Sequence, residues 1–220
     1  MVNNLVFTLT SPAGGGKDTC AYMIREYCES LGLKVLMISY ADYLKMICAR
    51  NFGYDGSNKE EGRKILQWFG TDVVKSIERD FWVRIVFQTF DLLNEEYDVF
   101  IVADARFEEE LQPYPYKLLY PIVNVYIDRK IETALGDDEY NHSSESMANN
   151  PDLNNFHYVI DNNDTLEYTY EQIENMVENV ILLQSKLLDE QRSLLYDDDD
   201  DDGLDEEISF DDLEMSDIDD

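Results

Sequence analysis

The sequence predicts one α/β domain, with a mostly parallel five-stranded sheet covered by helices on both faces. Short, continuously apolar runs alternate along the chain with longer segments that have apolar residues at helical spacing. Turns rich in Gly, Asp and Asn separate these segments. The chain has 220 residues, which suits one such domain with a full hydrophobic core.

The first third of the chain predicts two strands and two helices. The apolar run Val2–Thr10 predicts a buried strand, and Lys34–Ser39 predicts a second strand. Between them, Lys17–Leu31 has helical periodicity and ends at Gly32, a usual stop signal. Helical periodicity returns over Asp42–Asn51.

The middle of the chain predicts helices followed by a third strand. A short helix is expected over Glu60–Phe69, stopped by Gly70, and one or two more over Thr71–Glu95. The apolar run Val99–Ala103 predicts the third strand, which ends at Asp104. The core candidates of the helical part are Ile77, Phe81, Val83, Ile85, Val86, Phe90 and Leu93.

The last third predicts two further strands, over Ile122–Ile127 and Phe156–Ile160, and a long helix over Thr165–Arg192. Between the two strands, Gly136–Asn155 is polar and has no regular pattern. Irregular chain of that length inside a domain is either a disordered insertion or a lid that excludes water from a reaction. We therefore expect a domain over residues 1–192, with 136–155 as its candidate lid.

An acidic tail follows the domain, over residues 193–220. Residues 197–220 contain fifteen Asp or Glu and no Lys or Arg. Like-charge repulsion predicts that this tail is disordered. Its interspersed apolar residues are compatible with docking on a basic partner, but a purely solubilising tail is the more ordinary interpretation.

A phosphate-binding loop is predicted between the first strand and the first helix, in the segment Ser11-Pro-Ala-Gly-Gly-Gly-Lys17-Asp-Thr19. Glycine N–H groups and the following helix N-terminus surround a phosphate, and the Lys supplies a positive charge. This loop predicts the three-layer fold of the P-loop NTPase type. Ser11 stands where the usual pattern has Gly, and Asp18 where it has a Mg²⁺-binding Ser or Thr. The expected nucleotide-binding residues are Ala13, Gly14, Gly15, Gly16, Lys17, Asp18 and Thr19.

Further polar residues follow the predicted strands. Asp104, at the tip of a buried strand, has the form of a second nucleotide-binding signature, in which an Asp holds Mg²⁺ or its waters. Asp42 and Arg129 also follow strands. Because ligands bind at the carboxyl ends of parallel strands, we expect these residues and the phosphate loop to gather at one edge of the sheet.

Basic residues are scarce, so their positions are informative. The chain has 17 Lys and Arg against 48 Asp and Glu, a net charge of −31. Residues 1–196 alone retain 17 basic and 33 acidic residues, or −16, which argues against non-specific nucleic-acid binding. Arg63, Arg106 and Arg129 are the first candidates for neutralising transferred phosphate, and Lys75 and Arg79 the second.

Composition also indicates the compartment. The three cysteines have no metal-ligand spacing and predict buried thiols in a reducing environment. No apolar run approaches the roughly 20 residues that span a bilayer, and the first residues carry no basic leader. We expect a cytoplasmic protein that does not bind a membrane.

Several motifs together resemble a known family. They are Gly-Gly-Lys17-Asp-Thr19, Tyr40-Ala-Asp42-Tyr-Leu-Lys45, Arg63-Lys-Ile-Leu-Gln67-Trp-Phe-Gly70-Thr71-Asp72, Phe81-Trp82-Val83, Val102-Ala-Asp104-Ala-Arg106, Arg129 and His142-Ser-Ser144-Glu145. This order, over roughly residues 3–180, is similar to that of the bacteriophage-type deoxynucleoside monophosphate kinases, which are adenylate kinase-like P-loop kinases.

The resemblance implies a viral protein in the host cytoplasm that uses ATP and Mg²⁺ to convert a deoxynucleoside monophosphate into the diphosphate. By this resemblance the catalytic residues are Lys17, Arg63, Asp104, Arg106 and Arg129, and Asp18 and Asp104 hold the metal through water. The implied substrate-binding residues are Asp42, Lys45, Arg63, Gln67, Asp72, Arg106, His142 and Glu145.

Other functions remain open at this level. The acceptor of a P-loop kinase could be another small molecule, of the dephospho-coenzyme A or phosphomevalonate type. A catalytically silent nucleotide-binding scaffold, with the acidic tail engaging a basic partner, is a further alternative. The sequence also leaves the oligomeric state open, a homodimer included.

Overall fold

A computed structural model describes residues 4–130 and 142–196. The five strands are β1 (Leu5–Thr10), β2 (Val35–Ile38), β3 (Val99–Val102), β4 (Ile122–Asp128) and β5 (Tyr158–Asp161). They form one sheet in the order β2-β3-β1-β4-β5, and every pair of neighbours is parallel. The central strand is β1, whose Phe7 pairs with Ile101 of β3 and Val123 of β4. The predicted fold class is confirmed.

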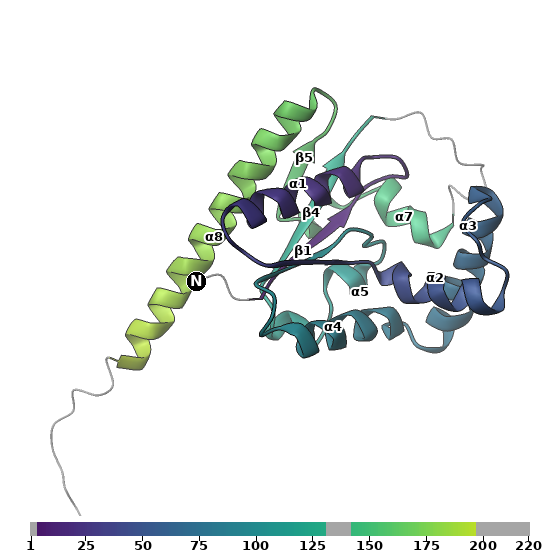
Figure 1. Cartoon of the computed structure of the whole chain (residues 1–220), viewed down its shortest axis with the longest axis horizontal. Coiled ribbons are helices and arrows are strands. Elements are labelled where there is room, and N and C mark those ends of the chain that lie inside the picture. Colours follow the sequence, from purple (N-terminus) through teal and green to yellow (C-terminus); the bar gives the residue numbers. More distant parts are fainter. Residues whose placement is uncertain (1–3, 131–141, 197–220) are drawn as a thin grey trace, which may run out of the picture.

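Helices cover both faces of this sheet, so the molecule has three layers (Figure 1). On one face, Leu5, Phe7 and Leu9 of β1 pack in a buried cluster with α1 (Lys17–Ser30) and α8 (Leu166–Tyr196). On the other face, the intervening Val6 packs with α2 (Tyr40–Asn51) and α4 (Phe81–Leu93). The alternation follows from strand geometry, since successive side chains point to opposite faces.

Local capping explains where the helices on the second face begin. Ser39 precedes α2 and forms a capping box with Asp42, in which the Ser39 N–H donates to the Asp42 carboxylate at 2.9 Å. Asn58 precedes α3 (Lys59–Gln67), and its side chain accepts from two backbone N–H groups of the first turn. The remaining short helices are α5 (Glu108–Leu111), η2 (Tyr116–Leu118), α7 (Ser143–Asn149) and η3 (Leu153–Asn155).

The predicted stop at Gly70 is wrong. The chain leaves α3 and continues through Gly70 as a π-helix, η1 (Trp68–Lys75). A π-helix is a rare form that is often found at functional sites. Ile77, predicted to lie in the core, is 83% exposed just after η1. A π-helix has more residues per turn than the α-helix that the sequence predicts. The residues after η1 therefore face other directions than expected.

The polar stretch expected to be irregular contains structure in its second half. Ser143–Asn149 forms α7, and Ala148 is buried. The Tyr126 hydroxyl of β4 donates to the Ala148 carbonyl oxygen at 3.0 Å, which fixes α7 to the sheet. Residues 131–141 lie outside the described residues, so the lid stays a prediction for that part.

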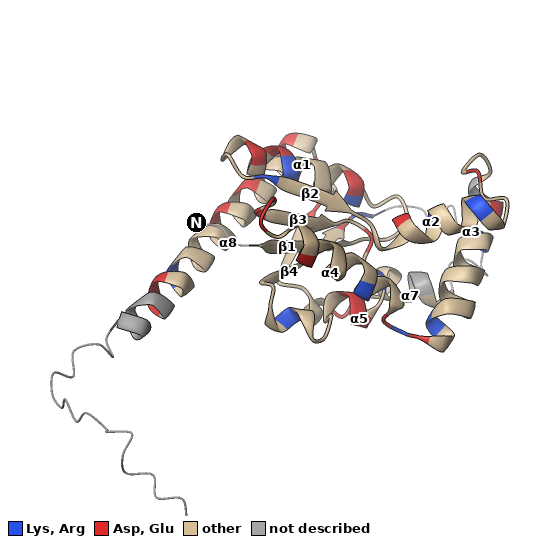
Figure 2. Ribbon diagram, turned by 60° about the horizontal axis from the view of Figure 1, so that its bottom comes forward, with Lys and Arg blue, Asp and Glu red and all other residues tan. Residues whose placement is uncertain are grey.

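The last described helix, α8, runs past the body of the molecule (Figure 1). Its first half is anchored by Ile173, Met176, Val177 and Val180, all of which are buried. Acidic and basic residues both occur on α1 and α3 (Figure 2). Among the described residues, no helix is both long enough and apolar enough to cross a bilayer.

Candidate active site

The phosphate loop joins β1 to α1 and depends on two left-handed glycines. Gly14 has a φ of +83° and Gly16 a φ of +92°, a region that residues with a side chain rarely enter. The Gly15 N–H donates to the Pro12 carbonyl at 2.9 Å within the loop. The Gly15 N–H is thus engaged within the loop, and phosphate binding by the glycine N–H groups stays a prediction.

Ser11, the odd residue of the loop pattern, is a packing residue. It is buried, and its hydroxyl donates to the Pro12 carbonyl at 3.0 Å. A Cβ added to Gly15 would lie 2.8 Å from the Ser11 Cβ. The Ser11 side chain thus occupies the space beneath Gly15, and residue 15 has room only for glycine.

Asn162, which directly follows the edge strand β5, holds the loop. Its side-chain Nδ2 donates to the Gly15 carbonyl at 2.9 Å, and its Oδ1 accepts from the Thr169 hydroxyl at 3.1 Å. Its backbone N–H donates to the Asp128 carbonyl at 2.8 Å. The ends of β4 and β5 are therefore tied to the loop. Sequence reasoning missed Asn162, whose only signal is its place directly after the fifth strand.

Arg129 follows β4 and lies beside the same loop. A Cβ placed on Gly16 would be 3.6 Å from a guanidinium nitrogen of Arg129. Burial raises the pKa of the Cys20 thiol at the start of α1 to about 11, and the nearby positive charge of Arg129 opposes that rise. The structure thus brings Arg129 to the phosphate loop, as the sequence predicted.

Lys17 and Asp18 begin α1 at the mouth of the loop. The Lys17 Nζ lies 3.2 Å from a carboxylate oxygen of Asp18, and the Lys17 side chain is 24% exposed. Both residues line the same cavity. Thr19 points to solvent on α1, and Thr19, Ala13 and Gly14 are not among the residues that line this cavity.

That cavity has a volume of about 410 Å³ and opens between the phosphate loop and α3. It is lined by residues from segments far apart in the sequence: the start of α1, the start of α2, α3, η1 and the loop after β3. Of the predicted site residues, those lining it are Lys17, Asp18, Lys45, Arg63, Gln67, Lys75, Asp104 and Arg106. Lining residues that sequence reasoning did not assign to the site include Ser39, Tyr54, Asn58, Thr71 and Phe107.

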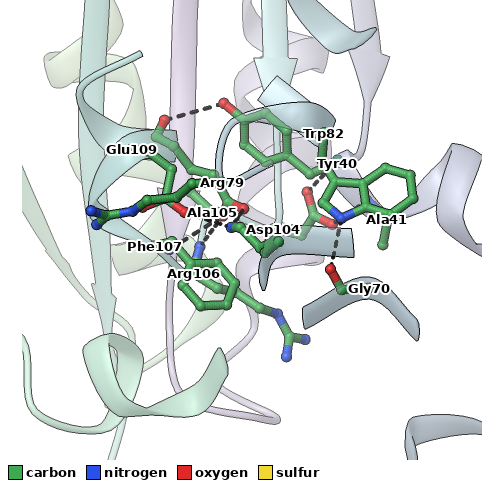
Figure 3. A network of polar contacts seen from close by, with 12 residues as sticks. Tyr40, Ala41, Gly70, Arg79, Trp82, Asp104, Ala105, Arg106, Phe107 and Glu109 are labelled. Atoms are coloured by element: carbon green, nitrogen blue, oxygen red, sulfur yellow. Dashed lines mark hydrogen bonds and ion pairs between the residues drawn. The ribbon is translucent and has the colours of Figure 1, made fainter. Parts of the chain in front are cut away.

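Asp104 lies at the carboxyl end of β3, and its carboxylate caps α2. It accepts from the Tyr40 N–H at 2.8 Å, from the Ala41 N–H at 3.0 Å and from the Ser39 hydroxyl. Figure 3 shows Asp104 beside Tyr40 and Ala41. A carboxylate at a helix N-terminus is favourable, because the free N–H groups there carry partial positive charge.

A buried hydrogen bond from Trp82 and a close contact with Leu44 both fix the π-helix at Gly70. The Trp82 Nε1 of α4 donates to the Gly70 carbonyl at 3.0 Å (Figure 3). A Cβ on Gly70 would lie 2.5 Å from a methyl carbon of Leu44 on α2. Trp82 is buried and also lines the cavity, whereas Trp68, the other tryptophan of this region, is half exposed.

Lys75 and Arg79, the second choices for phosphate binding, form ion pairs with α5. The Lys75 Nζ lies 2.8 Å from carboxylate oxygens of both Glu109 and Glu110, and the Arg79 Nε lies 3.0 Å from Glu109. Burial raises the pKa of Glu110, although the charge of Lys75 opposes this. Burial acts in the same direction on Glu109, but hydrogen bonding to Lys75 and the positive charges of Lys75 and Arg79 outweigh it, so the pKa of Glu109 is lowered.

The remaining predicted residues lie apart from the cavity lining. Asp42 is engaged in the capping box of α2 and lies 3.8 Å from the Lys45 Nζ. Asp72, on η1, has a carboxylate oxygen 3.5 Å from the Nε2 of His142, which precedes α7. The side chain of Glu145 lies outside those that the structure describes.

The described residues contain no cluster of three His, Cys, Asp or Glu side chains that could hold a metal ion. Asp18 and Asp104 both line the cavity, so carboxylate oxygens are present in it. This arrangement fits Mg²⁺, which in kinases is held by one or two carboxylates together with substrate phosphates and waters.

Comparison with known proteins gave one family match. A family model described as deoxynucleotide monophosphate kinase matches residues 34–173, a span that begins after the phosphate loop. Among curated proteins, none matches the sequence.

Three solved structures are similar to this chain. APE1195 has 15% identity and a TM-score of 0.47, covering 82% of this chain and 98% of its own. The dephospho-CoA kinase from Campylobacter jejuni has 16% identity and a TM-score of 0.44, covering 80% and 96%. An alanine mutant of the APS kinase CysC from Mycobacterium tuberculosis has 12% identity and a TM-score of 0.41, covering 84% and 99%.

Proposed function

The chain belongs to the deoxynucleotide monophosphate kinase family, and from that premise we propose that it transfers the γ-phosphoryl group of ATP to a deoxynucleoside monophosphate. One observation carries the assignment of the site. A single cavity connects Lys17, at the phosphate loop, with Arg63 and Gln67 on α3. Donor and acceptor phosphates must meet in line for such a transfer, and this cavity supplies a continuous space for them.

The donor end of the cavity is built for phosphate. Lys17 and Asp18 line it, and next to them lie the α1 N-terminus, the left-handed Gly14 and Gly16, and Arg129, which supply positive charge or N–H groups for phosphate. We assign Lys17 to the transferred phosphoryl group, so that binding of ATP draws its ammonium away from Asp18. Asp18 and Asp104 would orient Mg²⁺, which neutralises charge on the phosphates.

The acceptor end is built by α3 and η1. Arg63 is suited to bind the monophosphate, because a guanidinium binds two phosphate oxygens at once. Gln67 and Asn58 carry amides able to pair with a base edge, and Tyr54 and Trp82 supply aromatic surface. Arg106, on the loop after β3, would stabilise charge on the phosphoryl group as it passes between the two ends.

The first test removes the donor-binding charge. Lys17→Ala should lower kcat/KM by at least about 100-fold, because one preorganised charge on a transferring group contributes on that scale. Its melting temperature should stay close to that of the wild type, since Lys17 is partly exposed. Lys64→Ala is the matched control, because Lys64 is an exposed lysine paired with Glu60 and is not among the cavity-lining residues. Wild-type turnover by Lys17→Ala would contradict the assignment.

The second measurement identifies the acceptor. Transfer of labelled phosphate from ATP and Mg²⁺ should be measured to each common deoxynucleoside and ribonucleoside monophosphate, with dephospho-coenzyme A as a further acceptor. We expect diphosphate product from at least one deoxynucleoside monophosphate and none from dephospho-coenzyme A. Transfer to dephospho-coenzyme A alone would replace the proposed substrate class.

A further inference from the structure

The loop after β3 carries two of the proposed site residues, Asp104 and Arg106, and one buried carboxylate fixes its backbone. Glu110, on α5, accepts from the Arg106 N–H at 2.7 Å and from the Phe107 N–H at 3.2 Å through the same oxygen, Oε2. The Glu110 side chain is only 4% exposed. Arg106 therefore leaves the sheet in a direction that Glu110 sets.

The other oxygen of Glu110 is held from a different part of the chain. Its Oε1 lies 2.8 Å from the Lys75 Nζ, and Lys75 is 7% exposed at the end of η1. The same ammonium lies 3.3 Å from the centre of the Phe107 ring, next to Arg106 in the sequence. Lys75 thus contacts both the residue that fixes the loop and the loop itself.

These contacts connect the two ends of the cavity. Lys75 ends η1, the continuation of the helix that carries Arg63 and Gln67. Glu110 belongs to the segment after β3, and its backbone carbonyl accepts from the Tyr40 hydroxyl of α2 at 3.1 Å. Figure 3 shows Tyr40, Asp104, Arg106 and Phe107 in this part of the molecule.

A buried ion pair is poor evidence for stability, because removing two charges from water costs about as much as their attraction returns. Apolar side chains of similar size would fill the same space. What apolar side chains do not supply is an acceptor for the Arg106 and Phe107 N–H groups. The Glu110 carboxylate is therefore explained by the loop backbone that it orients rather than by a gain in stability.

We propose that Glu110 and Lys75 are positioning residues for the transfer reaction: Lys75 holds the Glu110 side chain in place, and Glu110 orients the loop that presents Arg106 to the cavity. The inference rests on the proposed function, because Arg106 is assigned to the phosphoryl group there. Both residues lie in the cavity wall, but their side chains are only 7% and 4% exposed, so we assign Lys75 and Glu110 to act through Arg106.

The test compares two double variants that both remove the buried charges. K75M/E110Q keeps a side-chain oxygen that accepts from the Arg106 N–H, whereas K75M/E110M removes it. We expect K75M/E110Q to retain kcat within about 3-fold of the wild type and K75M/E110M to lose about 30-fold, a size typical of a misplaced group in the site. The KM for ATP should change little in both, because the phosphate loop is held by other residues.

A second readout is independent of activity. The exchange rate of the Arg106 backbone amide with deuterium, followed by NMR, should stay slow in K75M/E110Q and become fast in K75M/E110M. Arg79→Met is the matched control, because Arg79 pairs with the neighbouring Glu109 and is 71% exposed. It should leave both kcat and this exchange rate unchanged.

Equal kcat and equal Arg106 exchange in the two double variants would overturn the proposal. If K75M/E110M does not fold, the single variant K75M decides: wild-type kcat with a protected Arg106 amide would refute the role of Lys75. If the wild-type protein transfers phosphate to no nucleoside monophosphate, the proposed function fails, and the exchange measurement alone then tests the positioning claim.

Discussion

The backbone conformation and one neighbouring side chain both restrict position 16 to glycine. The Gly16 φ of +92° disfavours any side chain, and a Cβ there would also lie 2.4 Å from the Asn162 Nδ2. A movement of that nitrogen would break its hydrogen bond to the Gly15 carbonyl. Two independent constraints, one of backbone conformation and one of space, therefore act on Gly16.

Gly16→Ala should separate these constraints when it is compared with Gly32→Ala. Gly32 has a similar φ of +82°, but a Cβ there would meet nothing within 4 Å. Gly32→Ala should cost about 1–2 kcal/mol of the free energy of unfolding, the usual cost of a left-handed alanine. Gly16→Ala should cost more and should also raise the KM for ATP, because Asn162 must release the loop. Equal unfolding free energies in urea titrations would show that Asn162 imposes no constraint.

At the scale of elements, the π-helix η1 connects the cavity wall to α2. It carries Thr71 and Lys75 into the cavity wall, and its Gly70 packs against Leu44 of α2. An α-helix with the same residues would rotate the following side chains, since the two helical forms differ in residues per turn. The close approach at Gly70 and the hydrogen bond from Trp82 are the features that hold η1 in place.

A double-mutant cycle tests that packing. Gly70→Ala should destabilise the protein by about 1–3 kcal/mol, because its methyl group overlaps Leu44. Leu44→Ala removes a nearly buried side chain and should cost about 2–5 kcal/mol. The double variant should cost less than the two together, since each change makes room for the other. Strict additivity of the unfolding free energies would mean that Gly70 and Leu44 are not in contact.

On the scale of the whole molecule, the last described helix, α8, ends far from the candidate site. The C-terminal end of α8 lies on the side of the molecule away from α3 (Figure 1). Residues 197–220 lie outside the described residues, so their partner and their contribution to the domain boundary remain predictions. These residues contain fifteen of the 48 acidic residues, so their negative charge should affect the binding of an anionic nucleotide.

Deleting residues 197–220 should leave kcat and both KM values within about 2-fold at roughly 0.15 M salt, where charges act over only about 8 Å. At low salt the KM for ATP should fall, because less negative charge then repels the nucleotide. Steady-state kinetics at both salt concentrations give the comparison. A loss of activity above 10-fold would place the tail in the catalytic mechanism.

Much of the fold was predictable because its signals are local. The apolar runs, the turn residues and the Gly-Gly-Lys17 segment each specify a structure over a few residues. The predicted strands coincide with β1 to β5 to within a few residues at their ends. The π-helix was not predictable, because it depends on the contact with Leu44 and on Trp82 twelve residues away.

The candidate site, too, was predictable only where its signals are local. By itself, the sequence determined the parallel sheet, the phosphate loop with Lys17, and the gathering of Asp104, Arg106 and Arg129 near it, since parallel strands bring their carboxyl ends to one edge. Only the tertiary structure decided that Asp104 caps α2, that Asn162 holds the loop and that Lys75 pairs with Glu110. These roles depend on hydrogen bonds between segments 35 to 147 residues apart, which no local pattern encodes.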